Sequence, residues 1–206
     1  MKQINIKRDA TGKVTFDTVS IDTTENVFFT NLDPQAAHWP TFPNNQPFAT
    51  NQLGAAPSPN SSQCTVPPPD DLNPPNNQVS YGCKIAGHGN ERGVVNVFAP
   101  LAPVDDTTLA PATKGTAIAV QPLVTGGMSP YAISGQLFQV TDKNGNVIQS
   151  GSGSIGPGLK LNASSDSSGI SVSGTPTMSG TYNFTFTVND GMGKNLQQTQ
   201  YVMVVA

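Results

Sequence analysis

The sequence predicts an all-β protein built from two β-sandwiches. Charged residues make up only 11% of the 206 residues, well below the roughly 25% of an average soluble protein. The chain has only two glutamates and no runs rich in Ala, Leu, Glu and Lys, which argues against a helical bundle. Thr, Val, Ser and Asn are abundant beside 20 Gly and 18 Pro, as expected for short strands joined by tight turns.

The chain divides into two halves of different composition. The first half holds both cysteines, both histidines and the only tryptophan, and the second half holds none of these. Between them, the segment 99–106 alternates proline with small residues, which is typical of a stiff, extended linker. We therefore predict a first domain over residues 1–103 and a second domain over residues 104–206.

Four strands are predicted in the first half, because apolar and β-branched residues cluster or alternate there. These strands are Val14–Phe16, Asn26–Thr30, Gln78–Cys83 and Val94–Phe98. The intervening segment Pro57–Pro75 holds seven prolines and shows no alternation. We expect it to form a long surface loop.

Five further strands are predicted in the second half. They are Thr116–Val120, Leu137–Val140, Asn146–Ile148, Tyr182–Val188 and Gln200–Val205. The tripeptide Lys143-Asn144-Gly145 joins the second and third of these strands and predicts a β-hairpin with a type I′ turn. Residues 182–188 alternate aromatic or Val side chains with polar ones, so one face of that strand is expected to be buried. Strands spaced roughly 8–12 residues apart are typical of a sandwich.

Two histidines and one cysteine carry the chemical information in this sequence. Cys83 and His88 lie at the two ends of one short loop, so that a thiolate and an imidazole can bind the same ion. His38 comes from a distant segment that follows a predicted strand, and it completes a set of three donors. One soft thiolate with two imidazole nitrogens is the ligand set of a mononuclear type 1 copper site.

At these residues the first half resembles the cupredoxin family of copper proteins. The matching pattern is a strand and turn before His38, then Tyr81-Gly82-Cys83, His88 after a four-residue spacer, and Gly93 at the start of a last strand. The resemblance implies a Greek-key β-sandwich with one copper ion near one end. It also implies equatorial ligation by His38, Cys83 and His88, and electron transfer through the loop histidine near the surface.

The axial position is where the sequence departs from the family pattern. The family usually places a methionine shortly before the glycine of the last strand, whereas Glu91 stands at that place here. A carboxylate there is a hard donor that favours Cu(II) and lowers the reduction potential. The alternative is that Glu91 points to solvent and forms a surface ion pair with Arg92.

The second cysteine allows a different interpretation of the first half. An extracytoplasmic chain with two cysteines commonly oxidises them to a disulfide. A bond between Cys64 and Cys83 would tether the proline-rich loop and leave no thiolate for copper. The first half would then be a metal-free structural or adhesion module, and the sequence leaves both interpretations open.

Three motifs in the second half resemble the Ig-like, cadherin-like repeat of bacterial surface proteins. They are Gly158-Leu159-Lys160-Leu161, the segment Gly169–Pro176 and the segment Ser179–Phe184. The resemblance implies an Ig-like β-sandwich in which these residues form turns and core. The segment Ser134–Gly156 departs from the pattern, as an inserted hairpin would.

Composition and charge exclude several classes of function. The net charge is −3 and Lys and Arg do not cluster, which argues against nucleic-acid binding. No apolar run reaches the ~18 residues of a membrane span. Two histidines already assigned to a metal leave none for a hydrolytic triad, so we expect no enzyme. Sparse charge is typical of a periplasmic or secreted bacterial protein, and we expect that a signal peptide has been removed and that the partner is an unidentified redox or surface protein.

Overall fold

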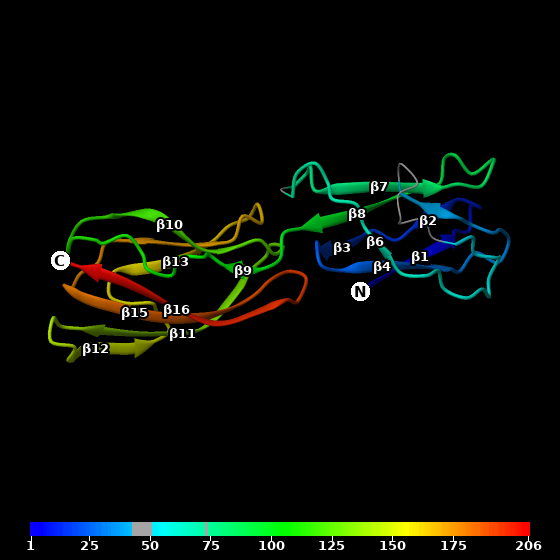
Figure 1. Ribbon diagram of the computed structural model, residues 1–206. Coiled ribbons are helices and arrows are strands. Elements are labelled where there is room, and N and C mark those ends of the chain that lie inside the picture. Colours follow the sequence, from blue (N-terminus) through cyan, green and yellow to red (C-terminus); the bar gives the residue numbers. More distant parts are fainter. Residues whose placement is uncertain (43–50, 73) are drawn as a thin grey trace. The chain divides into compact units, whose positions relative to one another are not determined.

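A computed structural model of the chain describes residues 1–42, 51–72 and 74–206, and every regular element over these residues is a β-strand (Figure 1). The chain forms two compact units, Met1–Ala99 and Pro100–Ala206. Each unit packs two four-stranded sheets around its own apolar cluster. The predicted all-β fold class and the β-sandwich architecture are therefore confirmed.

The first unit contains two mixed sheets, in the strand orders β2-β1-β4-β6 and β3-β8-β7-β5. Its strands are β1 (Lys2–Arg8), β2 (Val14–Phe16), β3 (Val19–Asp22), β4 (Asn26–Asn31), β5 (Pro40–Thr41), β6 (Cys64–Thr65), β7 (Gln78–Cys83) and β8 (Arg92–Phe98). β1 pairs with β4 in parallel, as does β3 with β8, and the other pairs are antiparallel. β6 lies inside the predicted proline-rich loop, which is therefore partly anchored to the first sheet.

Alternation along these strands places one face of each sheet in the core. Ile4 and Ile6 of β1 and Phe29 of β4 are fully buried from the first sheet, and Val95 and Val97 of β8 meet them from the second. Burying a side chain of this size contributes roughly 1.5–3 kcal/mol relative to leaving it exposed. This packing fixes the strand ends that carry the candidate metal ligands.

The second unit contains two further sheets, in the orders β13-β14-β10-β9 and β12-β11-β15-β16. Its strands are β9 (Ala102–Pro103), β10 (Ile118–Thr125), β11 (Ala132–Thr141), β12 (Val147–Ser152), β13 (Leu159–Ala163), β14 (Ile170–Gly174), β15 (Gly180–Asn189) and β16 (Asn195–Val205). The predicted alternation on β15 is confirmed, because Tyr182, Phe184, Phe186 and Val188 are all buried. The positions around Ser134–Gly156 form the hairpin of β11 and β12, with β12 at the sheet edge.

Two details differ from the sequence predictions. Ala102 and Pro103 form β9, which pairs with β10, so this part of the predicted linker belongs to the second sandwich. The unit boundary accordingly lies between Ala99 and Pro100 rather than after Pro103.

The turn between β11 and β12 is not of type I′. The Gly145 N–H donates to the Asp142 carbonyl at 3.0 Å, which makes Lys143 and Asn144 the central residues. A type I′ turn needs positive φ at both central residues, but among the described residues Ser167 is the only non-glycine with positive φ. Gly145, at φ 83°, takes the left-handed position after the turn instead, as in hairpins with a longer loop.

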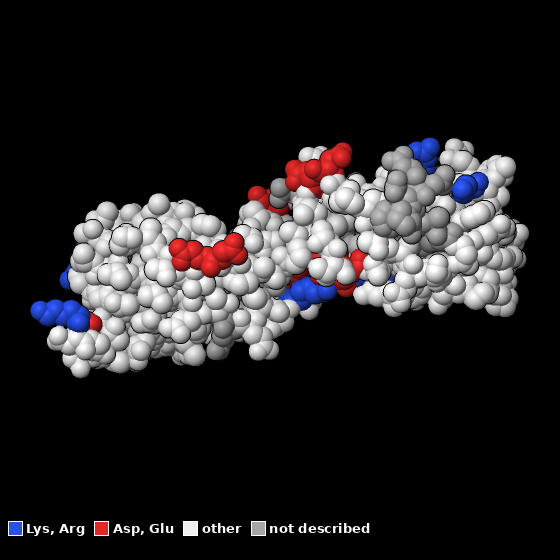
Figure 2. All heavy atoms as spheres, in the orientation of Figure 1, with Lys and Arg blue, Asp and Glu red and all other residues white. Residues whose placement is uncertain are grey.

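The surface carries few charges in accordance with the composition. Figure 2 shows Lys, Arg, Asp and Glu as small separate groups on the face drawn. Within the described part of the chain, no helix has the length and apolar character needed to cross a membrane.

Candidate metal centre

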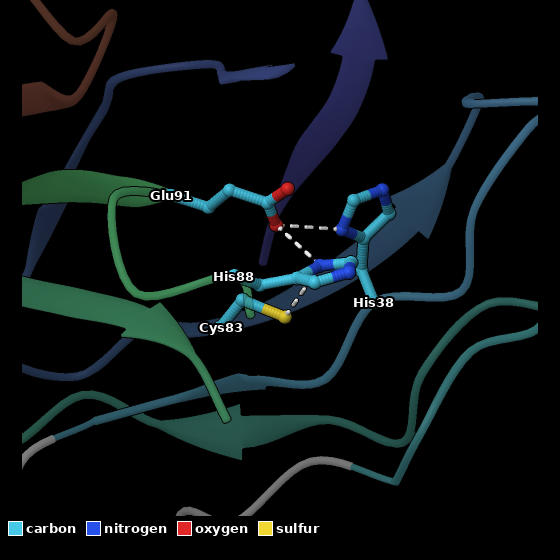
Figure 3. Close-up of side chains that lie close together, drawn as sticks. All are labelled: His38, Cys83, His88 and Glu91. Carbon is cyan, nitrogen blue, oxygen red and sulfur yellow. Dashed lines mark hydrogen bonds and ion pairs between the residues drawn. The ribbon is translucent and has the colours of Figure 1, made fainter. Parts of the chain in front are cut away.

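Four side chains from three segments of the first unit converge at one place. His38 lies in the segment between β4 and β5, Cys83 is the last residue of β7, and His88 and Glu91 lie in the loop between β7 and β8. One donor atom from each of the four residues lies within 4.8 Å of the other three (Figure 3). All four residues are the ones that the sequence predicted as metal ligands.

The loop that carries two of these donors is closed by its own backbone. The Cys83 N–H donates to the Glu91 carbonyl at 3.1 Å, and the Glu91 N–H donates to the His88 carbonyl at 2.9 Å. The His88 N–H donates to the Ile85 carbonyl at 3.1 Å, and Gly87 supplies a left-handed φ of 89° between them. These bonds hold His88 and Glu91 beside the end of β7.

Glu91 occupies the middle of the cluster. Its Oε2 lies 2.9 Å from His38 Nδ1 and 3.0 Å from His88 Nδ1, while Cys83 Sγ lies 3.6 Å from His88 Nδ1. Figure 3 shows the carboxylate directed toward both rings. The alternative prediction, a solvent-facing Glu91 paired with Arg92, is therefore wrong, because the carboxylate lies against the two histidine rings and only 16% of the side chain is exposed.

The four side chains differ in exposure. The side chain of His38 is 0% exposed, whereas those of Glu91 and His88 are 16% and 22% exposed. Cys83 is half-buried. The cluster thus has a buried side at His38 and a side that solvent reaches at His88.

The Cys83 sulfur lies among backbone donors. The Trp39 N–H donates to Sγ at 3.3 Å. Burial raises the pKa of the Cys83 thiol above its ordinary value, and the backbone N–H groups of Trp39 and Ile85 oppose that rise. Hydrogen bonds to a cysteine sulfur are among the features that tune the potential of a copper–thiolate site.

The predicted alternative of a Cys64–Cys83 disulfide is wrong. Both cysteines are free thiols in the structure. Cys64 is buried on β6, where its thiol donates to the Val27 carbonyl at 3.5 Å. Burial raises the pKa of Cys64 to about 11, so this thiol is an inert part of the core rather than a bridge or a ligand.

The sequence prediction missed two residues next to the cluster, Asp33 and Arg8. The other ring nitrogen of His38, Nε2, lies 2.9 Å from Oδ2 of Asp33, and that carboxylate is paired with Arg8. Burial disfavours the charged form of Asp33, but the hydrogen bonds from Arg8, Gln35 and His38 outweigh it and hold its pKa well below the usual range.

The chemistry of the donor set fits a copper ion. A cysteine sulfur and two imidazole nitrogens are the soft and intermediate donors that copper takes, and a carboxylate oxygen adds one hard anionic donor. Zinc also accepts Cys, His and Glu ligands. The residues present therefore suit a transition metal with sulfur and nitrogen preference rather than calcium or magnesium, which take oxygen ligands.

Comparisons with known proteins do not assign the chain to a family. No family profile matches the chain, and no curated protein matches it. The polymeric Ig receptor ectodomain of a teleost fish aligns at 11% identity with TM-score 0.27, over 98% of each chain. A Bacteroides ovatus protein, SGBP-B of a mixed-linkage glucan utilization locus solved with a heptasaccharide, aligns at 11% identity with TM-score 0.21, over 97% of this chain and 51% of its own.

A third solved structure, cadmium-bound SporoSAG, aligns at 12% identity with TM-score 0.22, over 100% of this chain and 96% of its own. Likenesses at these TM-scores carry no argument about the site. The cupredoxin interpretation therefore rests on the residues of this chain.

Proposed function

We propose that this protein holds one copper ion between His38, Cys83, His88 and Glu91, and that it carries electrons or copper in an extracytoplasmic compartment. The observation that carries the proposal is the convergence within 4.8 Å of the imidazole of His38 with a thiol, an imidazole and a carboxylate from the distant stretch 83–91. These are the only two histidines of the chain. The packing of a hydrophobic core does not by itself explain why both histidines lie beside the same cysteine.

Copper is favoured over zinc by the affinity order of divalent metals, in which Cu(II) exceeds Zn(II) at a given site. A copper ion supplies a one-electron couple when bound. The residues supply what such a couple needs: donors held on strand ends and closed loops, so that little rearrangement accompanies a change of oxidation state. The carboxylate of Glu91 adds negative charge, which stabilises Cu(II) more than Cu(I).

The exposure of the donors supports a route for exchange with a partner. The side chains of His88 and Glu91, both in the loop between β7 and β8, are 22% and 16% exposed, while His38 is enclosed. A redox or surface protein would therefore approach at the loop between β7 and β8. The second unit contains no histidine or cysteine, and we assign it the role of an Ig-like accessory module rather than of an enzyme.

The proposal is tested by titrating the reduced protein with Cu(II). We expect one equivalent to bind and to produce a visible thiolate-to-copper absorption band that ascorbate bleaches reversibly. Cys83→Ser abolishes the band, and His88→Ala abolishes or strongly shifts it. Cys64→Ser is the matched control, since Cys64 lies outside the cluster, and it keeps the band.

Two outcomes would overturn this function. Failure of the wild-type protein to take up copper stoichiometrically would leave a metal-free structural module. Tight binding of Zn(II) in preference to Cu(II), measured by competition and elemental analysis, would assign the cluster to a redox-inert ion.

A further inference from the structure

We propose that Asp33 is a positioning residue for this metal centre. Its buried carboxylate, held in place by Arg8, orients the ring of His38 and strengthens that ring as a donor. The inference rests on the proposed copper site, and it concerns residues outside the four donors. Arg8 and Asp33 together would set the relative stability of the two copper oxidation states.

Every oxygen of the Asp33 carboxylate has a defined partner. Oδ2 accepts a hydrogen bond from an Arg8 terminal nitrogen at 2.7 Å and lies 2.9 Å from His38 Nε2. Oδ1 accepts from Arg8 Nε at 3.0 Å and from the Gln35 N–H at 2.9 Å. The side chains of Asp33 and His38 are both 0% exposed. A two-pronged guanidinium–carboxylate pair of this kind fixes orientation as well as charge.

The sheet brings Arg8 and Asp33 together. β1 and β4 run parallel in a register that pairs Ile6 with Asn31. Arg8 and Asp33 each lie two residues further along (8 − 6 and 33 − 31), so they reach the same edge of the sheet. The side chain of Asn31 then accepts a hydrogen bond from the Asp33 N–H at 2.9 Å.

The backbone of His38 is held independently. Its N–H donates to the Leu53 carbonyl at 3.0 Å, and the Leu53 N–H donates back to the His38 carbonyl at 2.8 Å. The Ala56 N–H donates to the Asp33 carbonyl at 2.8 Å. Both ends of the short segment from Asp33 to His38 are therefore anchored to the same neighbouring segment.

This arrangement decides which ring nitrogen of His38 can bind a metal. The Nδ1 atom faces Glu91 and the cluster, and the Nε2 atom faces Asp33. A metal at the cluster requires Nδ1 without a proton, and Asp33 is the acceptor that lets the ring keep its proton on Nε2. A carboxylate at this nitrogen makes the imidazole a stronger donor, as outer partners of metal-bound histidines do.

Asp33→Asn tests the inference, with far-UV circular dichroism to confirm folding. We expect the affinity for Cu(II) to fall by roughly 10–100-fold, the range typical of lost outer partners. The affinity for Cu(I) falls less, because its charge is smaller, so the reduction potential rises by about 59 mV for each tenfold difference between the two losses.

The matched control is Asp17→Asn. Asp17 also pairs with a cation, Lys7, at 2.9 Å, but its side chain is 34% exposed and its hydrogen bonds go to Lys7 and Asn5. This variant keeps the wild-type affinity and potential. If Asp33→Asn has a lower unfolding temperature but the wild-type reduction potential, the Arg8–Asp33 pair is only structural and does not influence the His38 ring. That outcome overturns the inference.

The two proposals fail in different ways. If the wild-type protein shows no thiolate-to-copper band, the proposed copper site is refuted. If wild type and Asp33→Asn bind copper with the same affinity and potential, the proposed copper site is supported and the proposed role of Asp33 is refuted. Should Asp33→Asn not fold, nitrogen-15 NMR of the wild-type Cu(I) form decides: a proton on Nε2 of His38 supports the inference, and an unprotonated Nε2 overturns it.

Discussion

Glu91 has an environment that differs from that of an ordinary surface glutamate. One oxygen of its carboxylate lies at hydrogen-bond distance from the Nδ1 atoms of both His38 and His88, and only 16% of the side chain is exposed. The two ring nitrogens and the carboxylate oxygen thus converge on one point, where a metal ion could take all three as ligands.

Replacing Glu91 by Gln removes the negative charge while keeping the shape of the side chain. We expect Cu(II) affinity to fall by more than the roughly 10–100-fold that outer partners contribute. The reduction potential rises, because the lost charge favoured Cu(II), and the visible band persists since Cys83 is unchanged. Competition titration and spectroelectrochemistry measure both effects.

Glu25→Gln is the control for this substitution, since Glu25 is the only other glutamate and its carboxylate pairs with the N-terminal amine. It leaves affinity and potential unchanged. Equal affinities of wild type and Glu91→Gln would remove Glu91 from the ligand set and leave three donors.

The four metal donors were predictable from sequence, whereas Asp33 and Arg8, which contact His38 from outside the donor set, were not. Cys83 and His88 share one short loop, and His38 is the only other histidine, so residue type and spacing were enough to identify them. Asp33 follows a strand, where aspartates commonly form turns. Its role depends on Arg8, and the two meet only through the parallel pairing of β1 with β4, which local sequence does not encode.

At the scale of elements, the hairpin of β7 and β8 sets the position of Cys83. The antiparallel register pairs Tyr81 with Gly93 and Gly82 with Arg92. Tyr81 is 2% exposed and stacks edge-on against Phe16, with ring centroids 5.5 Å apart. Its ring lies over Gly93, so that the strand pair can close only where position 93 has no side chain.

Gly93→Ala is expected to destabilise the first unit by about 1–3 kcal/mol, the typical cost of overpacking. A methyl group at this position would overlap the Tyr81 hydroxyl and lie 2.9 Å from Phe16 Cβ. Urea unfolding followed by tryptophan fluorescence measures the change, because the only tryptophan, Trp39, lies in this unit.

Gly89→Ala provides the comparison for this experiment. A methyl group at Gly89 would meet no atom within 4 Å, and Gly89 does not have a positive φ. The free energy of unfolding of the Gly89→Ala variant should stay within roughly 0.5 kcal/mol of the wild-type value, as for an ordinary surface substitution. Equal stability of the two variants would show that Tyr81 can move aside without cost.

The sequence predicted most long strands but not their partners. β2 and β7 were predicted with their observed bounds, because their apolar residues are local signals. β1 and β3 were missed, although Ile4 and Ile6 alternate with polar residues as a strand requires. β5 and β6 have two residues each, and such short strands exist only through pairing with β7 and β4.

At the scale of the whole molecule, the two sandwiches have separate apolar clusters. The cluster of the first unit includes Phe29 and Tyr81, and that of the second includes Tyr182 and Tyr201. All four candidate donors belong to the first unit. Binding energy at the cluster is therefore coupled to the folding of the first unit, since a ligand stabilises the part that must be folded to bind it.

Copper should consequently protect the two units unequally from hydrogen exchange. At a free copper concentration about 1,000 times Kd, binding stabilises the folded state by about 4.1 kcal/mol, so amides of β4, β7 and β8 exchange more slowly. Amides of β15 and β16 keep their rates, because their cluster contains none of the donors. Exchange followed by mass spectrometry measures both regions in one experiment, with Cys83→Ser as the control that shows no slowing. Equal slowing in β15 and β16 would contradict the prediction and would mean that the second sandwich unfolds together with the metal-binding one.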